Sequence, residues 1–452
     1  MVKRGTYRVR RLSMEALASV STYVWVALTP LTSMTAGGVR LSDLTLVVAA
    51  VAWVLVAVTR PPRRAGLFAL VWTGTMLLLA IAVLASSTHS TNVTESLSVG
   101  FQFLWSVALV LLVLYAVSSD PRRLERVFSS YVVGAAVLAA SVLFLPTHAS
   151  GRGAGLAGHP VEVGGALSVA IAYVFVLMAS KPRFLWMLIP TQLLLFSGVL
   201  GSEALTGLVA ALVGTVVGLL FVERKIRSWT FVAGTLLIAG MLLVATPTGT
   251  ALWQKALESF TSGLSTDPST AADGSTLQSR IVTITLGLDR ALEHPISGSG
   301  FDSSGQIVIF DLKPHNVLVY AWLAGGVIVA VFFLSALIAT IATSVVALRR
   351  PSIVVLPRAA LGPALAAIAA AWASALSGPQ LYQRGWLLMA LVLPAAGLAH
   401  LAARRDAMPE IALRKTPTAR HSGQVAHISL QRDRPGQTTN QRVDEQLESS
   451  RR

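Results

Sequence analysis

The sequence predicts an all-α polytopic membrane protein with about twelve membrane-spanning helices. Of its 452 residues, 54% are hydrophobic and only 13% are charged. Apolar blocks of 17 or more residues recur along the chain, and this is the length that an α-helix needs to cross a hydrocarbon core of about 30 Å. The alternating ten-residue pattern of a membrane barrel does not recur, so each block is expected to form a helix.

The expected spans divide the chain into five parts. A basic N-terminal segment, 1–14, precedes nine spans within 15–246, and a large extracytoplasmic loop, 247–314, separates the ninth span from three more within 315–402. Residues 403–452 are polar and lack periodic apolar positions, which predicts a disordered cytoplasmic tail. The expected spans are 15–35, 41–59, 66–85, 99–117, 128–145, 161–179, 184–200, 204–222, 229–246, 315–347, 359–376 and 385–402.

The distribution of Lys and Arg predicts the orientation of the chain in the plasma membrane. With a cytoplasmic N-terminus, all but seven of the 36 basic residues fall in cytoplasmic segments, as the positive-inside rule requires. Both termini are therefore predicted to be cytoplasmic, and the net charge of +15 needs no nucleic-acid partner; membrane lipids are the expected surroundings. The basic residues on the predicted outer side are Arg40, Arg152, Lys255, Arg280, Arg290, Lys313 and Arg384.

Several kinds of site are not expected. The chain has no cysteine, so it has neither a disulfide framework nor a thiolate metal site. It also lacks an HExxH pair, clustered carboxylates and a phosphate-binding glycine loop, so we expect no metal and no cofactor. The first apolar block is not followed by a small-residue cleavage site, which favours a membrane helix over a removed signal.

The loop 247–314 contains a predicted amphipathic helix in the run STLQSRIVTITLGLDRALEHPISGSGF, residues 275–301. Ser275 and Gln278 have capping-box spacing, and Pro295 with the following glycines ends the helix. Arg280 lies at the edge of the apolar stripe and is placed to reach into the protein, whereas Arg290 lies well round toward the opposite side. A solvated helix face is the alternative for both arginines and is favoured for Arg290. The stripe comprises Leu277, Ile281, Ile284, Leu288 and Leu292.

Two other outer segments carry candidate site residues. The glycine-rich run THASGRGAGLAGHPVEVGG, residues 147–165, contains Arg152, His159 and Glu162, and Glu203 lies near the outer end of the eighth span. Arginine suits bidentate contact with phosphate and keeps its charge, so Arg152 with Arg280 would suit a diphosphate. An ordinary interfacial loop arginine is the alternative for Arg152, and the two glutamates are either partners of arginine or surface caps.

His315 lies at the predicted outer end of the tenth span, directly before Asn316. The partial positive charge of a helix N-terminus favours a neutral imidazole, which can accept a proton from a hydroxyl or orient that hydroxyl. Asp311 is the expected helix cap. The alternative for His315 is a histidine that is only hydrogen-bonded at the interface, and Lys313 is expected to snorkel.

These residues resemble motifs of the O-antigen ligase and polymerase family of bacterial envelope glycan assembly. Arg152 is followed after three residues by Leu156, and His315-Asn316 is followed after nine residues by Gly326. The SR…ALEHPISGSGF run, 279–301, is similar to the family's loop-helix arginine and the turn that follows it. The likeness covers about 145–335 in motifs and the whole chain in topology.

The resemblance implies a metal-independent, inverting glycosyltransferase with a membrane-embedded fold of the GT-C type. Such an enzyme transfers or polymerises a glycan from a polyprenyl-diphosphate carrier onto an acceptor hydroxyl of a glycan, lipid or protein at the outer face of the plasma membrane. By this resemblance Arg152 and Arg280 hold the diphosphate, His315 activates the acceptor, and Asn316 orients the site. The further substrate-binding candidates are His159, Glu162, Glu203 and Arg290.

The chain departs from the family at several positions. Glu203 follows Ser202 where the family often has Ser-Arg, His159-Pro160 replaces a Pro-Asn pair, and Val329 stands where Gly, Thr or Tyr is commoner. A transporter or lipid flippase and a non-catalytic scaffold are the competing hypotheses. Charges gather at the outer edge while the span interiors are almost uncharged, which favours chemistry at an interface over a conduction path.

Overall fold

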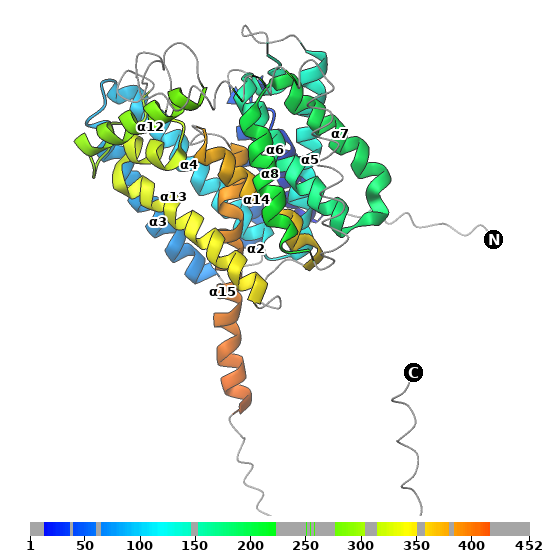
Figure 1. Ribbon diagram of the computed structural model, residues 1–452. Coiled ribbons are helices and arrows are strands. Elements are labelled where there is room, and N and C mark those ends of the chain that lie inside the picture. The colour runs from blue at the N-terminus through cyan, green and yellow to red at the C-terminus, as the bar shows by residue number, and fades with distance from the viewer. Residues whose placement is uncertain are drawn as a thin grey trace, which may run out of the picture. The chain divides into compact units, whose positions relative to one another are not determined.

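The computed structural model describes residues 13–36, 39–59, 65–145, 152–222, 276–302, 314–349, 358–378 and 384–415, with the single positions 250, 254 and 257. These ranges are almost entirely helical (Figure 1). The main helices are α1 (Met14–Leu28), α2 (Leu41–Thr59), α3 (Ala65–Ser87), α4 (Val93–Val117), α5 (Pro121–Phe144), α6 (Pro160–Ser180), α7 (Leu185–Ser202), α8 (Leu205–Leu219), α12 (Thr276–Glu293), α13 (Val317–Arg349), α14 (Arg358–Leu376) and α15 (Arg384–Lys415). Short 3-10 turns are η1 (Gly155–Ala157) and η2 (Pro182–Phe184).

The helices confirm an all-α polytopic membrane protein. Within the described ranges, eight helices are long and apolar enough to cross a membrane, and α1, α8 and α14 contain shorter apolar helices at three further predicted spans. The predicted span 229–246 lies outside the described residues, so the number twelve stays a prediction. One small departure from the all-helical expectation is an antiparallel hairpin between α1 and α2, in which β1 (Thr35–Ala36) pairs with β2 (Val39–Arg40).

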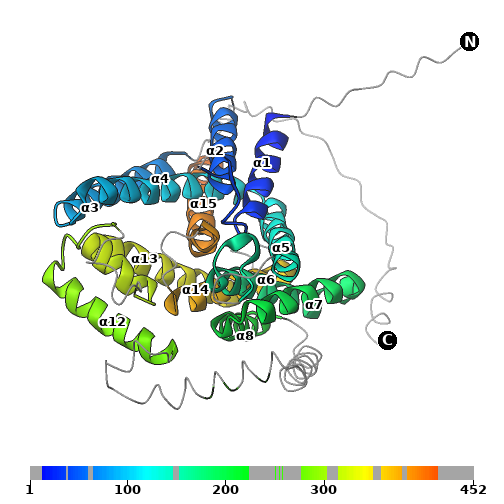
Figure 2. The ribbon, with the colours of Figure 1, turned by 90° about the horizontal axis from the view of Figure 1, so that it is seen from above.

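The helices α6, α8 and α14 pack closely against one another through small residues. A Cβ atom on Gly214 of α8 would lie 2.4 Å from the carbonyl oxygen of Ala366 on α14, and one on Gly218 would lie 2.6 Å from the Cβ of Ala366. Such close backbone approach is typical of helix packing in membranes. Seen from above, α15 lies between this group and the pair α3 and α4 (Figure 2).

Helix α13 is broken at Gly326, where φ is 69° and ψ is −169°. The segment 294–302 docks at this break: the Ser299 amide donates to the Leu323 carbonyl (2.7 Å), and the Val327 amide donates to the Pro295 carbonyl (3.0 Å). A Cβ atom at Gly326 would lie 2.0 Å from the Ile296 carbonyl oxygen. Gly326 is therefore required both by its positive φ and by the close approach of the docked segment.

The other side of the docked segment is bound to α4 and its preceding turn. The amide of Phe301 donates to Ser96 Oγ (2.8 Å), and Thr91 Oγ1 donates to Asp302 Oδ2 (3.0 Å). The phenyl ring of Phe301 is buried and stacks on Phe103 at 5.7 Å between ring centroids. The segment after α12 is thus held between α4 and α13, and it fixes the C-terminal end of α12.

Helix α12 forms where the sequence predicts it, but its buried face differs from the expected one. The buried residues are Thr283, Gly287 and Ala291, and a Cβ atom on Gly287 would lie 3.0 Å from the ring of Pro314. Ile281 and Leu292 of the apolar stripe remain 49% and 61% exposed. The small face is buried because it permits close contact with α13, and this leaves the bulky side chains beside it.

Helix α15 continues to Lys415, past the predicted boundary at residue 403. The run from Leu401 to Lys415 is rich in Ala, Arg and Leu, which have high helix propensity. The chain divides into two compact units, Met1–Ala407 and Met408–Arg452, and every candidate site residue belongs to the first.

Candidate functional site

The N-terminus of α13 is capped by Asn316. Its side-chain Oδ1 accepts hydrogen bonds from the amides of Leu318 (2.9 Å) and Val319 (3.2 Å), and its Nδ2 donates to the Leu376 carbonyl at the end of α14 (3.3 Å). Asp311, the cap expected from the sequence, lies outside the described residues. Asn316 therefore ties α13 to α14 and fixes the position of the preceding residue, His315.

His315 contacts α12 through the hydroxyl of Thr283. Thr283 Oγ1 lies 3.4 Å from His315 Nδ1 and donates its proton to the Arg280 carbonyl at 3.0 Å. Because this hydroxyl proton is engaged, its oxygen is left to accept, which favours the tautomer with the proton on Nδ1. In that tautomer Nε2 carries the lone pair. One helical turn of α12 thus presents both the partner of His315 and the Arg280 side chain.

Three candidate catalytic residues come within electrostatic range of one another. Burial, and then the positive charge of Arg280, lower the pKa of His315 to about 4. Burial and the charge of Arg152 likewise lower the pKa of Arg280 from its ordinary value. This lowered pKa agrees with the neutral imidazole that the sequence predicts, but its causes are burial and a cation, whereas the sequence suggested the helix N-terminus. We call Arg152, Arg280 and His315 the cationic cluster.

Arg152 is anchored at the end of α7. Its Nε donates to the Ser202 carbonyl (3.0 Å) and its Nη2 to the Glu203 carbonyl (2.9 Å). Glu203 ends the helix with φ of 52°, and its carboxylate opposes the effect of burial, which lowers the pKa of Arg152. Two of the guanidinium donors therefore satisfy helix-end carbonyls, and the remaining donors of its planar fork are not used in these bonds.

The loop after Arg152 is also held by backbone bonds. The Gly153 amide donates to the Gly201 carbonyl (2.9 Å), and the Leu156 amide donates to Ser141 Oγ (2.9 Å). Leu156 in turn accepts from the amide of Ser33 (2.9 Å). The spacing between Arg152 and Leu156 thus spans a loop that joins the ends of α5 and α7 to the turn after α1.

The other predicted substrate-binding residues make local contacts. His159 caps α6, since its Nδ1 accepts from the Val161 amide (3.3 Å). Glu162 accepts a hydrogen bond from the Thr32 hydroxyl (2.6 Å). Arg290 lies on α12 ten residues beyond Arg280, which is about 15 Å along a helix axis. Contacts with substrate by these residues, and by Glu203 and Asn316, stay predictions.

Two features of this region were missed in the sequence. Thr283 was detectable, because it lies one helical turn from Arg280 and therefore on a similar face. The sequence predicts Arg384 on the outer side but does not indicate what it contacts. Its Nε donates to Asp43 Oδ1 at 2.9 Å and its Nη2 to Asp43 Oδ2 at 3.4 Å, and the pair joins the starts of α15 and α2 across 341 residues of sequence. No local signal links such distant residues.

The cationic cluster is suited to bind an anion. Arg152 and Arg280 supply planar donor groups in a partly buried setting, where charge-assisted bonds to phosphate oxygens are strong. Within the described ranges, no group of three or more His, Asp or Glu residues is arranged to hold a metal ion. His315 Nε2 adds a neutral acceptor beside the two cations.

The fold and the site define a polytopic α-helical membrane protein in which Arg280 lies within electrostatic range of both Arg152 and His315. Residues 190–334 match the family model of the O-antigen ligases. The match contains Arg280, His315, Asn316 and Gly326, whereas Arg152 lies before it. The resemblance to the O-antigen ligase and polymerase family is therefore confirmed by this segment. No curated protein matches the chain.

Proposed function

We propose that the protein is a glycosyltransferase that moves a glycan from a polyprenyl-diphosphate donor onto an acceptor hydroxyl at the outer face of the plasma membrane, in the assembly of a cell-envelope polysaccharide. The observation that carries the proposal is the convergence of Arg152, Arg280 and His315, which come from three separate segments. The match of 190–334 to the O-antigen ligases supports the same reaction class.

In the proposed reaction the acceptor oxygen attacks the anomeric carbon of the donor sugar. A new carbon–oxygen bond forms as the bond from that carbon to the diphosphate oxygen breaks, which inverts the configuration. The diphosphate leaves with the electron pair, and the guanidinium groups of Arg280 and Arg152 stabilise its growing negative charge. The products are the glycosylated acceptor and the polyprenyl diphosphate.

His315 receives the proton of the acceptor hydroxyl on Nε2. A ring with a pKa of about 4 is neutral at physiological pH and so is able to accept this proton, but it is a weak base before the donor binds. The negative diphosphate offsets the charge of Arg280, which is one of the two causes of the low pKa. Donor binding therefore raises the basicity of His315 in the complex where it is needed.

The test is transfer by the purified full-length protein in lipid nanodiscs. A lipid-linked oligosaccharide isolated from the source membranes is the donor, and transfer is measured as released polyprenyl diphosphate together with the elongated glycan. Wild type is expected to form both products in equal amounts, and His315→Ala to form neither while reaching the same membrane yield.

Three outcomes contradict the proposal. Full turnover by His315→Ala removes this residue from the reaction. Movement of the intact donor across the bilayer with no bond broken supports the flippase hypothesis instead. Loss of a partner protein from the membrane complex, with no transfer in wild type, supports the scaffold hypothesis.

A further inference from the structure

The part of α13 that follows its break has the length of a membrane span by itself. The apolar span of this helix runs from Val317 to Val346. Its portion beyond Gly326, residues 327–346, is about 30 Å long, which is the thickness of the hydrocarbon core of a bilayer. This match indicates that Gly326 lies near the outer boundary of the core. Exposed aliphatic side chains recur every three or four residues along this portion, on one face of the helix, and they include Val327, Val331, Leu334 and Ile338.

The docked segment extends this apolar surface beyond α13. The Pro295 carbonyl accepts from the Val327 amide (3.0 Å) and from the indole Nε1 of Trp322 (2.9 Å), so the next residue, Ile296, lies directly beside the break. Ile296 is 72% exposed, and Leu292, four residues earlier in α12, is 61% exposed. The exposed aliphatic face of α13 is thus followed, at its outer end, by two bulky aliphatic side chains of the extracytoplasmic segment.

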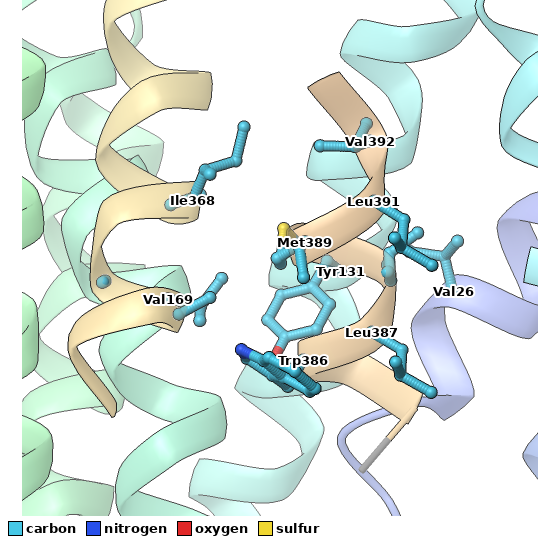
Figure 3. Close-up of a cluster of buried hydrophobic side chains, with 14 of the residues drawn as sticks. Val26, Tyr131, Val169, Ile368, Trp386, Leu387, Met389, Leu391 and Val392 are labelled. Carbon is cyan, nitrogen blue, oxygen red and sulfur yellow. The ribbon is translucent and has the colours of Figure 1, made fainter. Parts of the chain in front are cut away.

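Apolar side chains of this protein are covered where other helices surround them. Figure 3 shows Leu387, Leu391 and Val392 of α15 in a cluster of buried side chains, and each of the three is at most 1% exposed. Leu292 and Ile296, by contrast, keep most of their surface uncovered. Exposed aliphatic surface that adjoins a membrane-spanning helix is more stable against acyl chains than against water.

The polar residues around this patch suit the layer between acyl chains and water. Trp322 is half-buried, and its ring has one polar edge, which is a composition typical of the membrane interface. Glu293 is exposed and lies about 100° round α12 from Leu292. The end of α12 therefore has an aliphatic side and a charged side at the same level, as a helix that lies in the interface has.

We propose that Leu292 and Ile296 insert into the outer leaflet of the bilayer and anchor the end of α12 there. The partner is the acyl chains of lipids, because the patch directly continues the exposed aliphatic face of a membrane-spanning helix. The docked segment is then held by α4 and α13 on its protein side and by lipid on its other side. Since α12 carries Arg280, the bilayer helps to set the level of this arginine. The anchoring goes beyond the proposed transfer reaction and does not depend on it.

The first test measures what surrounds each side chain in a bilayer. The chain has no cysteine, so Leu292→Cys and Ile296→Cys each carry a single nitroxide label in the full-length protein, in nanodiscs of phosphatidylcholine and phosphatidylglycerol. Collisions of the label with oxygen, which concentrates among acyl chains, are compared with collisions with a water-soluble nickel complex. The ratio of oxygen to nickel accessibility at both positions is expected to be at least about threefold higher than at Glu293→Cys. It is expected to approach the ratio at Val331→Cys on the membrane-spanning part of α13.

Two results overturn the proposal. Labels at positions 292 and 296 that collide mainly with the nickel complex lie in water. Labels that neither reagent reaches are covered by protein, either by another part of this chain or by a second copy. Because no donor or acceptor is present, the result is the same whether or not the protein transfers a glycan.

The second test uses hydrogen exchange and needs no label. Ile296→Asn keeps the backbone bonds of the docked segment but places a polar side chain among acyl chains, so amide exchange of 294–302 in nanodiscs is expected to become at least about threefold faster. Ile296→Leu is expected to exchange like wild type. The control is Val39→Asn, which changes another exposed aliphatic side chain (53%) in β2 and should leave exchange of 294–302 unchanged. Equal exchange in Ile296→Asn and Ile296→Leu overturns the anchoring.

Discussion

Two arginines contribute to the same cationic cluster, but they are held in different ways. Arg152 donates to two carbonyls at the end of α7 and belongs to a loop with its own backbone bonds. The position of Arg280 instead follows from the docking of the whole of α12 against α13. Arg152 is thus fixed by hydrogen bonds to the adjacent backbone. The position of Arg280 depends on tertiary contacts of α12 that lie some distance from it.

Replacement of Arg280 is expected to have the largest effect on transfer. Arg280→Ala removes a cation that is proposed to stabilise the leaving diphosphate, and the loss of one such donor typically costs at least about 100-fold in rate. The free energy of unfolding should change little, because this guanidinium makes no hydrogen bond or ion pair with the residues that the structure describes. Arg183→Ala at the opposite end of the helices is the control, with wild-type transfer. If Arg280→Ala transfers normally, the two arginines do not share a function.

The second-largest effect on transfer is expected from displacement of the whole of α12. In Gly326→Ala the new Cβ meets the Ile296 carbonyl at 2.0 Å and φ of 69° is unfavourable, so the free energy of unfolding should fall by about 3 kcal/mol or more. Transfer should fall with it, because the docked segment 294–302 positions Arg280. Thermal unfolding and transfer are measured together.

Gly74→Ala is the control for this glycine. Gly74 lies in α3 with no atom within 4 Å of the position of its Cβ, so alanine should be neutral or should stabilise the helix by about 0.5–1 kcal/mol. A stable and fully active Gly326→Ala variant would show that Arg280 does not depend on the docking of α12.

Replacement of Arg152 is expected to have a smaller effect on transfer, together with a loss of stability. Arg152→Ala leaves two helix-end carbonyls unpaired and should lower the free energy of unfolding by about 2 kcal/mol in addition to slowing transfer. Arg152→Lys retains the charge but loses the planar fork, so it should recover part of the transfer and little of the stability. Equal stability of all three proteins would remove the structural role of Arg152 and, with it, the contrast to Arg280.

The smallest effect is expected in the dependence on pH. The proposed mechanism needs a neutral His315, so kcat/KM of the free enzyme should fall only as pH decreases through about 4. The acidic limb of the pH profile of kcat should lie at higher pH, because the bound diphosphate would offset the positive charge of Arg280. Coincident limbs for kcat and kcat/KM would contradict this coupling.

The same shift has a consequence for stability with a definite sign. The pKa of His315 is lower in the folded state than its ordinary value of 6.5, so the unfolded chain binds a proton first as pH falls. Above pH 6.5 the neutral His315 costs the folded state nothing relative to the unfolded chain. Between pH 6.5 and about 4, protonation of the unfolded chain lowers the free energy of unfolding. His315→Gln, which does not titrate, should show a smaller loss of stability over this interval.

Much of the architecture was predictable from apolar block length and periodicity, because both reflect the local requirement that membrane backbone satisfies itself. Helix α12 and its end near Pro295 were predictable from the capping-box spacing, the apolar periodicity and the Pro and Gly residues that follow. The buried face of α12 was not predictable. Gly287 and Ala291 are buried because their small size permits close packing on α13, and small residues add little to an apolar pattern. The ion pair of Arg384 with Asp43 was also beyond reach, since its partners are joined only by the tertiary fold.

The break in α13 also sets a strict distance along the chain. His315 and Gly326 lie eleven positions apart, with the cap at Asn316 at one end and the docked segment at the other. One residue inserted between them would turn the imidazole by about 100° and advance it by about 1.5 Å relative to the break. Conservative changes of side chain within this stretch are thus better tolerated than any change in its length.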